Sequence, residues 1–153
     1  DAKPFAARYP AARVLAPSGS RAKVAEVVAV TGTYADFPAD AGVTLAELDG
    51  LAGFEGVMTV RSGARTTLVF NDTIFNMPHV TGLQGFVLQH LTQSTGGPRV
   101  SRVERMFFVK SKPALRAHLE RLATDDLARI IVSHHETITE RPAETLRAIA
   151  ASL

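Results

Sequence analysis

The order of predicted strands and helices indicates a single layered α/β domain. Two β-rich runs, 57–60 and 66–70, flank a segment with turn chemistry, and the apolar run 129–132 precedes a final helix. Predicted helices separate these strands, and no internal repeat or low-complexity tract occurs in the 153 residues. We therefore expect one domain that spans residues 1–153.

The clearest local prediction is a β-hairpin. Residues 57–60 and 66–70 are rich in β-branched and apolar side chains, and the linking segment 61–65 contains a Ser-Gly pair. After Asn71 and Asp72 the chain is expected to leave the sheet. The run Arg-Ile-Ile-Val at 129–132 is typical of a strand that is buried on both faces, so we predict that it lies at the centre of the sheet.

Helix signals are strongest in the second half of the chain. Ser111 is predicted to cap a helix that has Pro113 in its first turn, and Pro142 to open the last helix. Residues 80–92 are predicted to be helical, with an apolar stripe of Leu83, Phe86, Val87 and Leu91. Shorter elements are expected nearer the start: helical segments at 5–9 and 20–28, strands at 13–16 and 43–48, and a loop at 31–42.

Composition restricts the chemistry. A hydrophobic fraction of 46% and a charged fraction of 21% are those of an ordinary soluble globular protein. The chain has no cysteine, which excludes a disulfide framework, a thiolate metal site and a cysteine nucleophile. Any metal site must therefore use His, Asp, Glu and backbone oxygen atoms.

Charge and hydropathy also limit the classes of partner that the protein can have. The net charge is +2, and Lys and Arg residues are interspersed with acidic ones, so we expect no nucleic-acid partner. No apolar run reaches the roughly 18–20 residues of a membrane span, so we expect no membrane partner and a cytoplasmic location. The chain begins at Asp1 without an initiator Met, and we expect an upstream segment in a longer protein.

Two polar segments follow predicted strands and are the candidate site. Asn71 and Asp72 follow the second hairpin strand, and Ser133 and His134 follow the run 129–132. Side chains at strand ends point into the crevice where α/β domains bind ligands, so Asp72 and His134 are expected to converge. The alternative is that Asp72 caps a turn and His134 has a structural hydrogen bond. His135 is expected to turn away from the crevice or to lie at its rim, because neighbouring side chains in an extended chain diverge.

These segments resemble the second half of the metallo-β-lactamase superfamily. In that family an Asp after a strand bridges two metal ions, and a His after the last buried strand completes the second metal site. The resemblance therefore implies that Asp72 and His134 are metal ligands, with zinc, iron or manganese as the cofactor. It also implies an αββα layered sandwich of which this chain is the C-terminal part, incomplete at its N-terminus. The family's Gly after the last histidine is His135 here.

The chain also departs from the family. The motif His-x-His-x-Asp-His is missing, and no histidine lies in 51–56, where the family's middle ligand belongs. Glu55 is the oxygen ligand that could replace it, with solvation or turn capping as the alternative, and His79 is close enough in sequence to reach the same crevice. Asp72 and His134 alone are two ligands short of a tetrahedral zinc site.

Two functions follow from these observations. The first is metal-dependent hydrolysis of an ester, amide or phosphoester, with further ligands from an upstream histidine motif. The second is a non-catalytic binding or assembly module that has lost the metal site. A single-metal iron site is a third alternative. The partner is expected to be a small-molecule substrate or none. The exposed strand edges of an incomplete sandwich predict either a homo-oligomer or a missing N-terminal segment.

Overall fold

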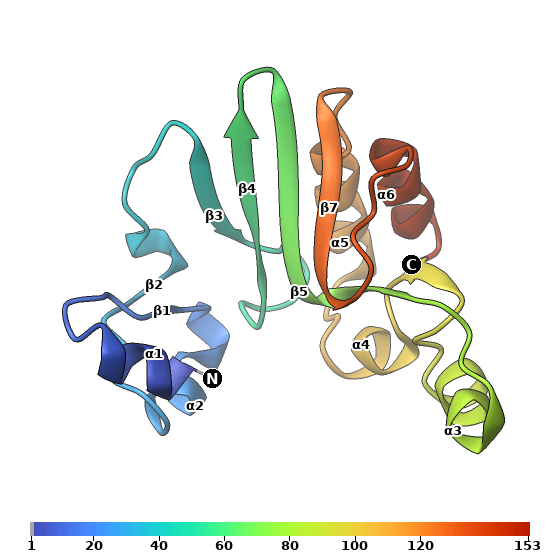
Figure 1. Cartoon of the computed structure of the whole chain (residues 1–153), viewed down its shortest axis with the longest axis horizontal. Coiled ribbons are helices and arrows are strands. Elements are labelled where there is room, and N and C mark those ends of the chain that lie inside the picture. Colours follow the sequence, from blue (N-terminus) through green and yellow to red (C-terminus); the bar gives the residue numbers. More distant parts are fainter. Residues whose placement is uncertain (1) are drawn as a thin grey trace.

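A computed structural model describes residues 2–153 and has a mixed α/β fold built around a five-stranded sheet (Figure 1). The central strand β5 pairs antiparallel with β4 and β6 and parallel with β7, and β3 completes the sheet beside β4. The strands are β3 (Val43–Glu47), β4 (Gly56–Ser62), β5 (Arg65–Met77), β6 (Gly97–Arg99) and β7 (Leu127–His135).

The predicted hairpin is confirmed. Strands β4 and β5 pair from Val57 with Phe70 to Ser62 with Arg65, and Gly63 in the turn has the positive φ of 58° that favours glycine. The expectation that the chain leaves the sheet after Asp72 is wrong. Strand β5 continues to Met77, because its last three residues find a new antiparallel partner in β6.

Two helices, α5 (Lys112–Leu122) and α6 (Pro142–Ala151), cover one face of the sheet (Figure 1). The Ser111 hydroxyl accepts a hydrogen bond from the backbone amide of Ala114, so the predicted cap is confirmed, and Pro142 occupies the first turn of α6. Their apolar stripes pack on the sheet to form the core, which includes the fully buried side chains of Leu68, Phe70, Leu115, Leu119, Ile130 and Leu146.

The prediction of a central strand buried on both faces at 129–132 is wrong. Strand β7 lies beside β5 at the edge of the sheet, and a short bridge from Ile130 to Ile138 covers part of its outer edge. Ile130 is fully buried against the helices, but Ile131 on the opposite face is 37% exposed. That face has no helix layer in the part of the chain that is described, and Ile131, Val69 and Met58 are register partners across it.

The N-terminal segment forms a small unit against the β3–β4 end of the sheet (Figure 1). Its two-residue strands β1 (Leu15–Ala16) and β2 (Gly32–Thr33) pair in parallel, and the rest is α1 (Ala2–Arg8), α2 (Arg21–Ala25) and 3-10 turns at 18–20 and 34–36. The amide of Gly19 donates to the carbonyl of Gly53, and the Ser20 hydroxyl donates to the carbonyl of Phe54. Ser20 therefore joins the unit to the segment before β4, and its side chain makes no capping hydrogen bond to α2.

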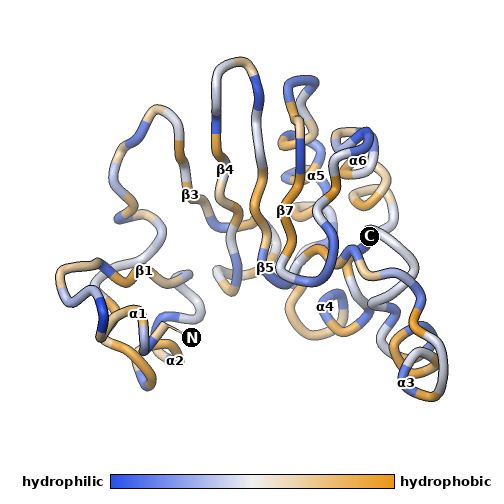
Figure 2. The backbone as a smooth tube through the Cα atoms, viewed as in Figure 1, coloured by the Kyte–Doolittle hydropathy of each residue, from blue (hydrophilic) through white to orange (hydrophobic). Residues whose placement is uncertain are grey.

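The segment between β5 and α5 contains three short helical pieces. A helix is confirmed within 80–92, as α3 (Gly82–Phe86) followed by a π-helical turn (Val87–Leu91), and α4 (Arg102–Phe107) was not predicted. The apolar stripe does not pack in the core: Leu83 is 82% exposed and Leu91 66%. Figure 2 shows why, since this hydrophobic segment projects away from the sheet.

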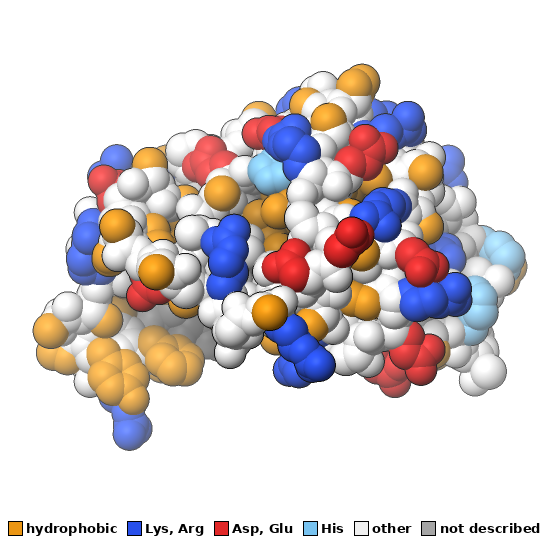
Figure 3. Space-filling model, turned by 90° about the horizontal axis from the view of Figure 1, so that it is seen from above, with side chains coloured by type: hydrophobic (Ala, Val, Ile, Leu, Met, Phe, Trp, Pro, Cys, Tyr) orange, Lys and Arg blue, Asp and Glu red, His pale blue; other side chains and the backbone are white. Residues whose placement is uncertain are grey.

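Helices in the described residues are short. The longest, α5, has 11 residues, and none is both long and apolar enough to cross a lipid bilayer. Charge on the molecular surface is mixed, with Lys and Arg side chains interspersed among Asp and Glu on the face seen in Figure 3.

Candidate functional site

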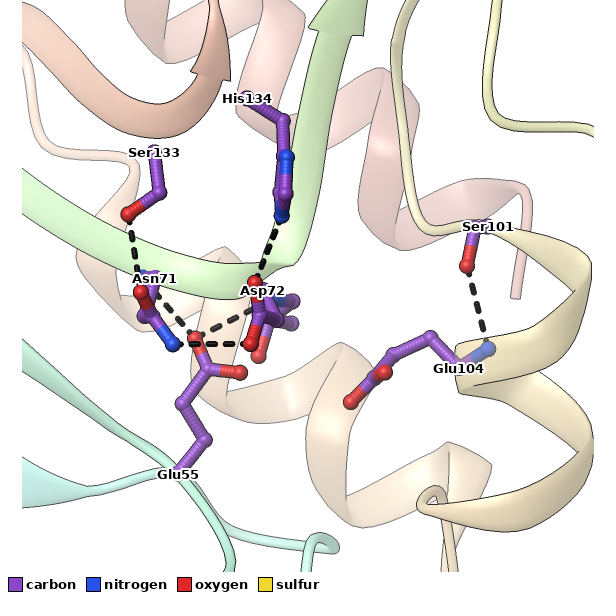
Figure 4. A network of polar contacts seen from close by, with 8 residues as sticks. Glu55, Asn71, Asp72, Ser101, Glu104, Ser133 and His134 are labelled. Atoms are coloured by element: carbon purple, nitrogen blue, oxygen red, sulfur yellow. Dashed lines mark hydrogen bonds and ion pairs between the residues drawn. The ribbon is translucent and has the colours of Figure 1, made fainter. Parts of the chain in front are cut away.

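The site begins with an irregularity in β5. Phe70 is the register partner of Val132 and Phe75 that of His134, so four residues of β5, 71–74, lie opposite the single residue Ser133 of β7. A bulge of this kind bends a strand and redirects side chains, and bulges are common beside functional sites. Here it brings the side chains of Asn71 and Asp72 towards the end of β7 (Figure 4).

A continuous row of hydrogen bonds links the two strands at the bulge (Figure 4). The Ser133 hydroxyl donates to Asn71 Oδ1 at 2.9 Å, and Asn71 Nδ2 donates to Asp72 Oδ2 at 2.9 Å. The second carboxylate oxygen, Oδ1, lies 2.7 Å from His134 Nε2. The structure thus brings Asp72 and His134 together, although both lie within strands and not at strand ends, and the turn-capping alternative for Asp72 is not seen.

The position of His134 is fixed from a second side. Its ring stacks on the ring of Phe75, with centroids 4.4 Å apart and planes within 3° of parallel. The His134 side chain is 38% exposed and that of Asp72 53%, so solvent and solutes reach both. Because the imidazole is held by a carboxylate and an aromatic face, it is oriented before any ligand arrives.

Glu55, just before β4, holds the bulge in place. Its Oε1 accepts hydrogen bonds from the backbone amides of Asn71 and Thr73, both at 3.0 Å, and the residue is only 8% exposed. Burial raises the pKa of this carboxyl above its usual value, the bonds from Thr73 and Asn71 lower it, and the charge of Asp72 raises it. Glu55 is therefore a structural acceptor for β5 amides that the bulge would leave unpaired.

Asp72, Asn71 and Glu55 also line a cavity of about 660 Å³. Its walls come from the N-terminal unit, from β5, from the π-helical turn and from α4, and they include four aromatic side chains. Phe54 and Phe108 meet edge to face with centroids 6.0 Å apart, and Tyr34 and Phe75 line the cavity too. The size falls within the range of small-molecule sites, about 300–1,000 Å³.

Glu104 on α4 is the third carboxyl of the cavity. It is 7% exposed, its side chain has no hydrogen bond within the described residues, and it points towards Glu55 and Asp72 (Figure 4). Burial, and then the negative charges of Glu55 and Asp72, raise the pKa of Glu104 to about 7. A carboxyl with this pKa is partly protonated at neutral pH, so it can either donate or accept a proton.

The other histidines lie elsewhere. His79 packs its ring against Gly96 and does not line the cavity. His135 does not line it either: it is exposed, its Nδ1 is 3.9 Å from Glu136 Oε1, and its backbone has a φ of 82°. His118 on α5 accepts a hydrogen bond from the amide of Asp49, away from the bulge, and the His90 ring packs at a tilt against the ring of Phe86.

The donor set does not fit a complete zinc site. Asp72 Oδ1 and His134 Nε2 could share an ion, but no group of three or more His, Asp or Glu side chains in residues 2–153 is arranged to hold one. Catalytic zinc sites use three protein ligands and structural ones four. Glu55, the expected replacement ligand, has one carboxylate oxygen occupied by two backbone amides.

Glu104 and the aromatic walls were not predicted from the sequence. One signal was available: Ser101-Arg-Val-Glu104 has the spacing of a helix capping box, which would have located the start of α4. The Ser101 hydroxyl does accept from the Glu104 amide, at 3.1 Å. The Glu104 carboxyl points into the cavity, however, and makes no bond back to the Ser101 amide.

Comparison with known proteins adds no relative. No protein-family model matches the chain, and no curated protein matches it.

Proposed function

We propose that the domain binds a small organic molecule in the cavity between the N-terminal unit, the bulge of β5 and α4. The observation that carries this proposal is the combination of aromatic walls with a few convergent polar groups, chiefly Glu55, Asp72 and Glu104. Small-molecule sites have this composition, because apolar area supplies affinity and a few polar atoms fix orientation. This is the binding-module function anticipated from the sequence.

The test is a ligand screen with a variant that fills the cavity. Val103 lines the cavity from α4 and is 41% exposed, so Val103→Trp should occupy the space without disturbing the core. Met106, on the same helix and 64% exposed, does not line the cavity, and Met106→Trp is the matched control. Saturation-transfer NMR with a library of cationic, neutral and anionic aromatic fragments should detect binders in the natural chain and in Met106→Trp.

For those binders we expect at least a tenfold loss of affinity in Val103→Trp. Binding that is equal in all three proteins would place the fragments on exposed apolar surface and would contradict the proposal. The absence of any binder would do the same.

Metal-dependent hydrolysis of an ester, amide or phosphoester is the second candidate. It is favoured by the contact of Asp72 with His134, the two residues that the metallo-β-lactamase resemblance assigns as ligands. The φ of 82° at His135 also agrees with that resemblance, because this conformation favours the glycine that the family has there. The open face around Ile131 and Val69 would then be where the other half of the sandwich packs.

This candidate requires donors beyond Asp72 and His134, supplied from outside the chain described here. Its test is zinc, iron and manganese analysis of the full-length protein and of Asp72→Ala, His134→Ala and the exposed control Asp125→Ala. Loss of metal in the first two variants alone supports the candidate. Equal metal content in all four proteins would leave the small-molecule cavity as the function of the domain.

A further inference from the structure

The charges that face the cavity all have one sign. Among its lining residues are three carboxyls, Glu55, Asp72 and Glu104, and no Lys, Arg or His. Glu55 is engaged by backbone amides and Asp72 by Asn71 and His134, so both already have partners. Glu104 differs from them because its carboxyl has no hydrogen bond although the residue is 93% buried.

A carboxyl that is mostly buried and opens only into a cavity loses part of its hydration at a cost in free energy, and no protein hydrogen bond replaces what is lost. The surrounding protein does not reduce that cost: the nearest charges, Glu55 and Asp72, repel the ionised form. A positively charged group placed in the cavity would remove the cost by supplying both a counter-charge and a hydrogen bond. The site is therefore complementary to a cation.

The walls indicate what kind of cation. Tyr34, Phe54, Phe75 and Phe108 line the space, and aromatic faces attract ammonium groups through their quadrupoles. A catalytic zinc ion would need three ligating side chains, and no group of three His, Asp or Glu side chains in residues 2–153 is arranged to hold one. A volume of about 660 Å³ suits an organic molecule of modest size.

We propose that the natural ligand is an organic monocation, an aliphatic or aromatic amine whose ammonium group lies against Glu104 while its apolar body lies among the aromatic rings. This rests on the proposed small-molecule function and names its ligand class. Glu104 is then the residue that selects charge, and the four aromatic side chains select apolar bulk.

The experiment compares three probes of similar shape on the full chain by isothermal titration calorimetry at pH 8. The probes are 2-phenylethylammonium, the neutral 2-phenylethanol and the anionic 3-phenylpropanoate. We expect the ammonium probe to bind at least tenfold more tightly than the alcohol, and the carboxylate not to bind. This comparison uses the natural chain and is independent of any variant.

Two variants then assign the selectivity to a residue. Glu104→Gln should weaken the ammonium probe at least tenfold and leave the alcohol unchanged, while Glu120→Gln, at an exposed position on α5, should change neither. Equal binding of ammonium and alcohol would overturn the cation inference and leave the small-molecule cavity intact. If none of the three probes binds and the fragment screen finds no binder, both the cation inference and the proposed small-molecule function are overturned.

Discussion

The two halves of β5 are formed in different ways. In the first half, Thr66–Phe70, every residue has a partner in β4 and a partner in β7, and core-facing side chains alternate with less buried ones. In the second half, Asn71–Met77, four residues of β5 lie opposite one residue of β7, a larger irregularity than the shift between Thr66 and Thr67, and two amides are satisfied by the carboxylate of Glu55. The conformation of the first half follows from the residues of the strand itself. That of the second half also depends on Glu55, which lies 16 to 18 positions away in the sequence.

The largest expected effect is in the regular half. Leu68 is 1% exposed, and Leu68→Ala removes a core side chain between the sheet and the helices. We expect a loss of about 3–4 kcal/mol in the free energy of unfolding, the usual cost of such a cavity. Val69 is next in sequence and faces the open side, so Val69→Ala should cost about 1 kcal/mol. Urea denaturation measures both, and equal losses would mean that the open face is buried in solution.

The second largest loss of stability is expected from substitution of Glu55, which tests whether this carboxylate holds the bulge. Glu55→Ala leaves the amides of Asn71 and Thr73 without their acceptor, and we expect a loss of about 2–3 kcal/mol. Glu55→Gln keeps an acceptor oxygen and should cost about 1 kcal/mol or less. Amide hydrogen exchange should reveal faster exchange at Asn71 and Thr73 in the alanine variant only. Unchanged protection there would show that the bulge holds without this carboxylate.

A smaller change in stability is expected at Glu104, and there the substitution should stabilise the chain. Glu104 has a pKa of about 7 in the folded chain, above the 4.5 of a free carboxyl, so the folded state binds more protons than the unfolded state between these values. Unfolding free energy therefore falls as pH rises from about 4.5 to about 7. Glu104→Gln removes this dependence and should stabilise the chain at pH 8 by about 1–3 kcal/mol, with little change at pH 4.

Thermal unfolding of both proteins across this pH range checks the prediction. Glu120→Gln is again the control, because its side chain is exposed. A stabilisation that is the same at pH 4 and pH 8 would exclude the titration of Glu104 as its cause.

The smallest expected effect is at the end of β7. His135 has a φ of 82°, a conformation that costs energy for any residue with a Cβ atom. His135→Gly relieves that cost but gains chain entropy in the unfolded state, so we expect a net stabilisation of about 1 kcal/mol or less. His135→Ala retains the Cβ atom and should not stabilise. Chemical denaturation of the two variants distinguishes backbone strain from loss of the imidazole.

The same comparison explains which parts of the fold were predictable. The hairpin, α5 and α6 have short-range signals: alternation on either side of a Ser-Gly turn, a Ser cap and an opening Pro. The apolar run at β7 was recognised as a strand, but its burial was misjudged. Each face of a strand is buried only if helices or a second sheet cover it. The spacing of apolar residues within a strand does not show whether such a layer is present.

The site was predictable only in part. Asp72 and His134 were identified because both follow apolar runs. Neither lies at a strand end, since β5 continues to Met77 and β7 to His135, and they meet because these strands are neighbours and the bulge turns Asp72 towards His134. The bulge, the clamp by Glu55 and the inward turn of Glu104 are tertiary contacts between segments that share no local pattern. The apolar stripe from Leu83 to Leu91 shows a different limit. Its helical spacing correctly predicted a helix, but its side chains remain exposed to solvent.

The bridge between Ile130 and Ile138 has a consequence for self-association. The amide and carbonyl of Ile130 are both bonded to Ile138, so the chain folds back over the middle of β7 and occupies the groups that an incoming strand would use. Strand addition at β7 would first have to displace this segment, which protects the edge against aggregation. Any sheet that grows between copies of this domain should therefore extend from β3, at the opposite edge. Substitution of Leu45 by Pro should stop it, because the Leu45 amide faces away from β4.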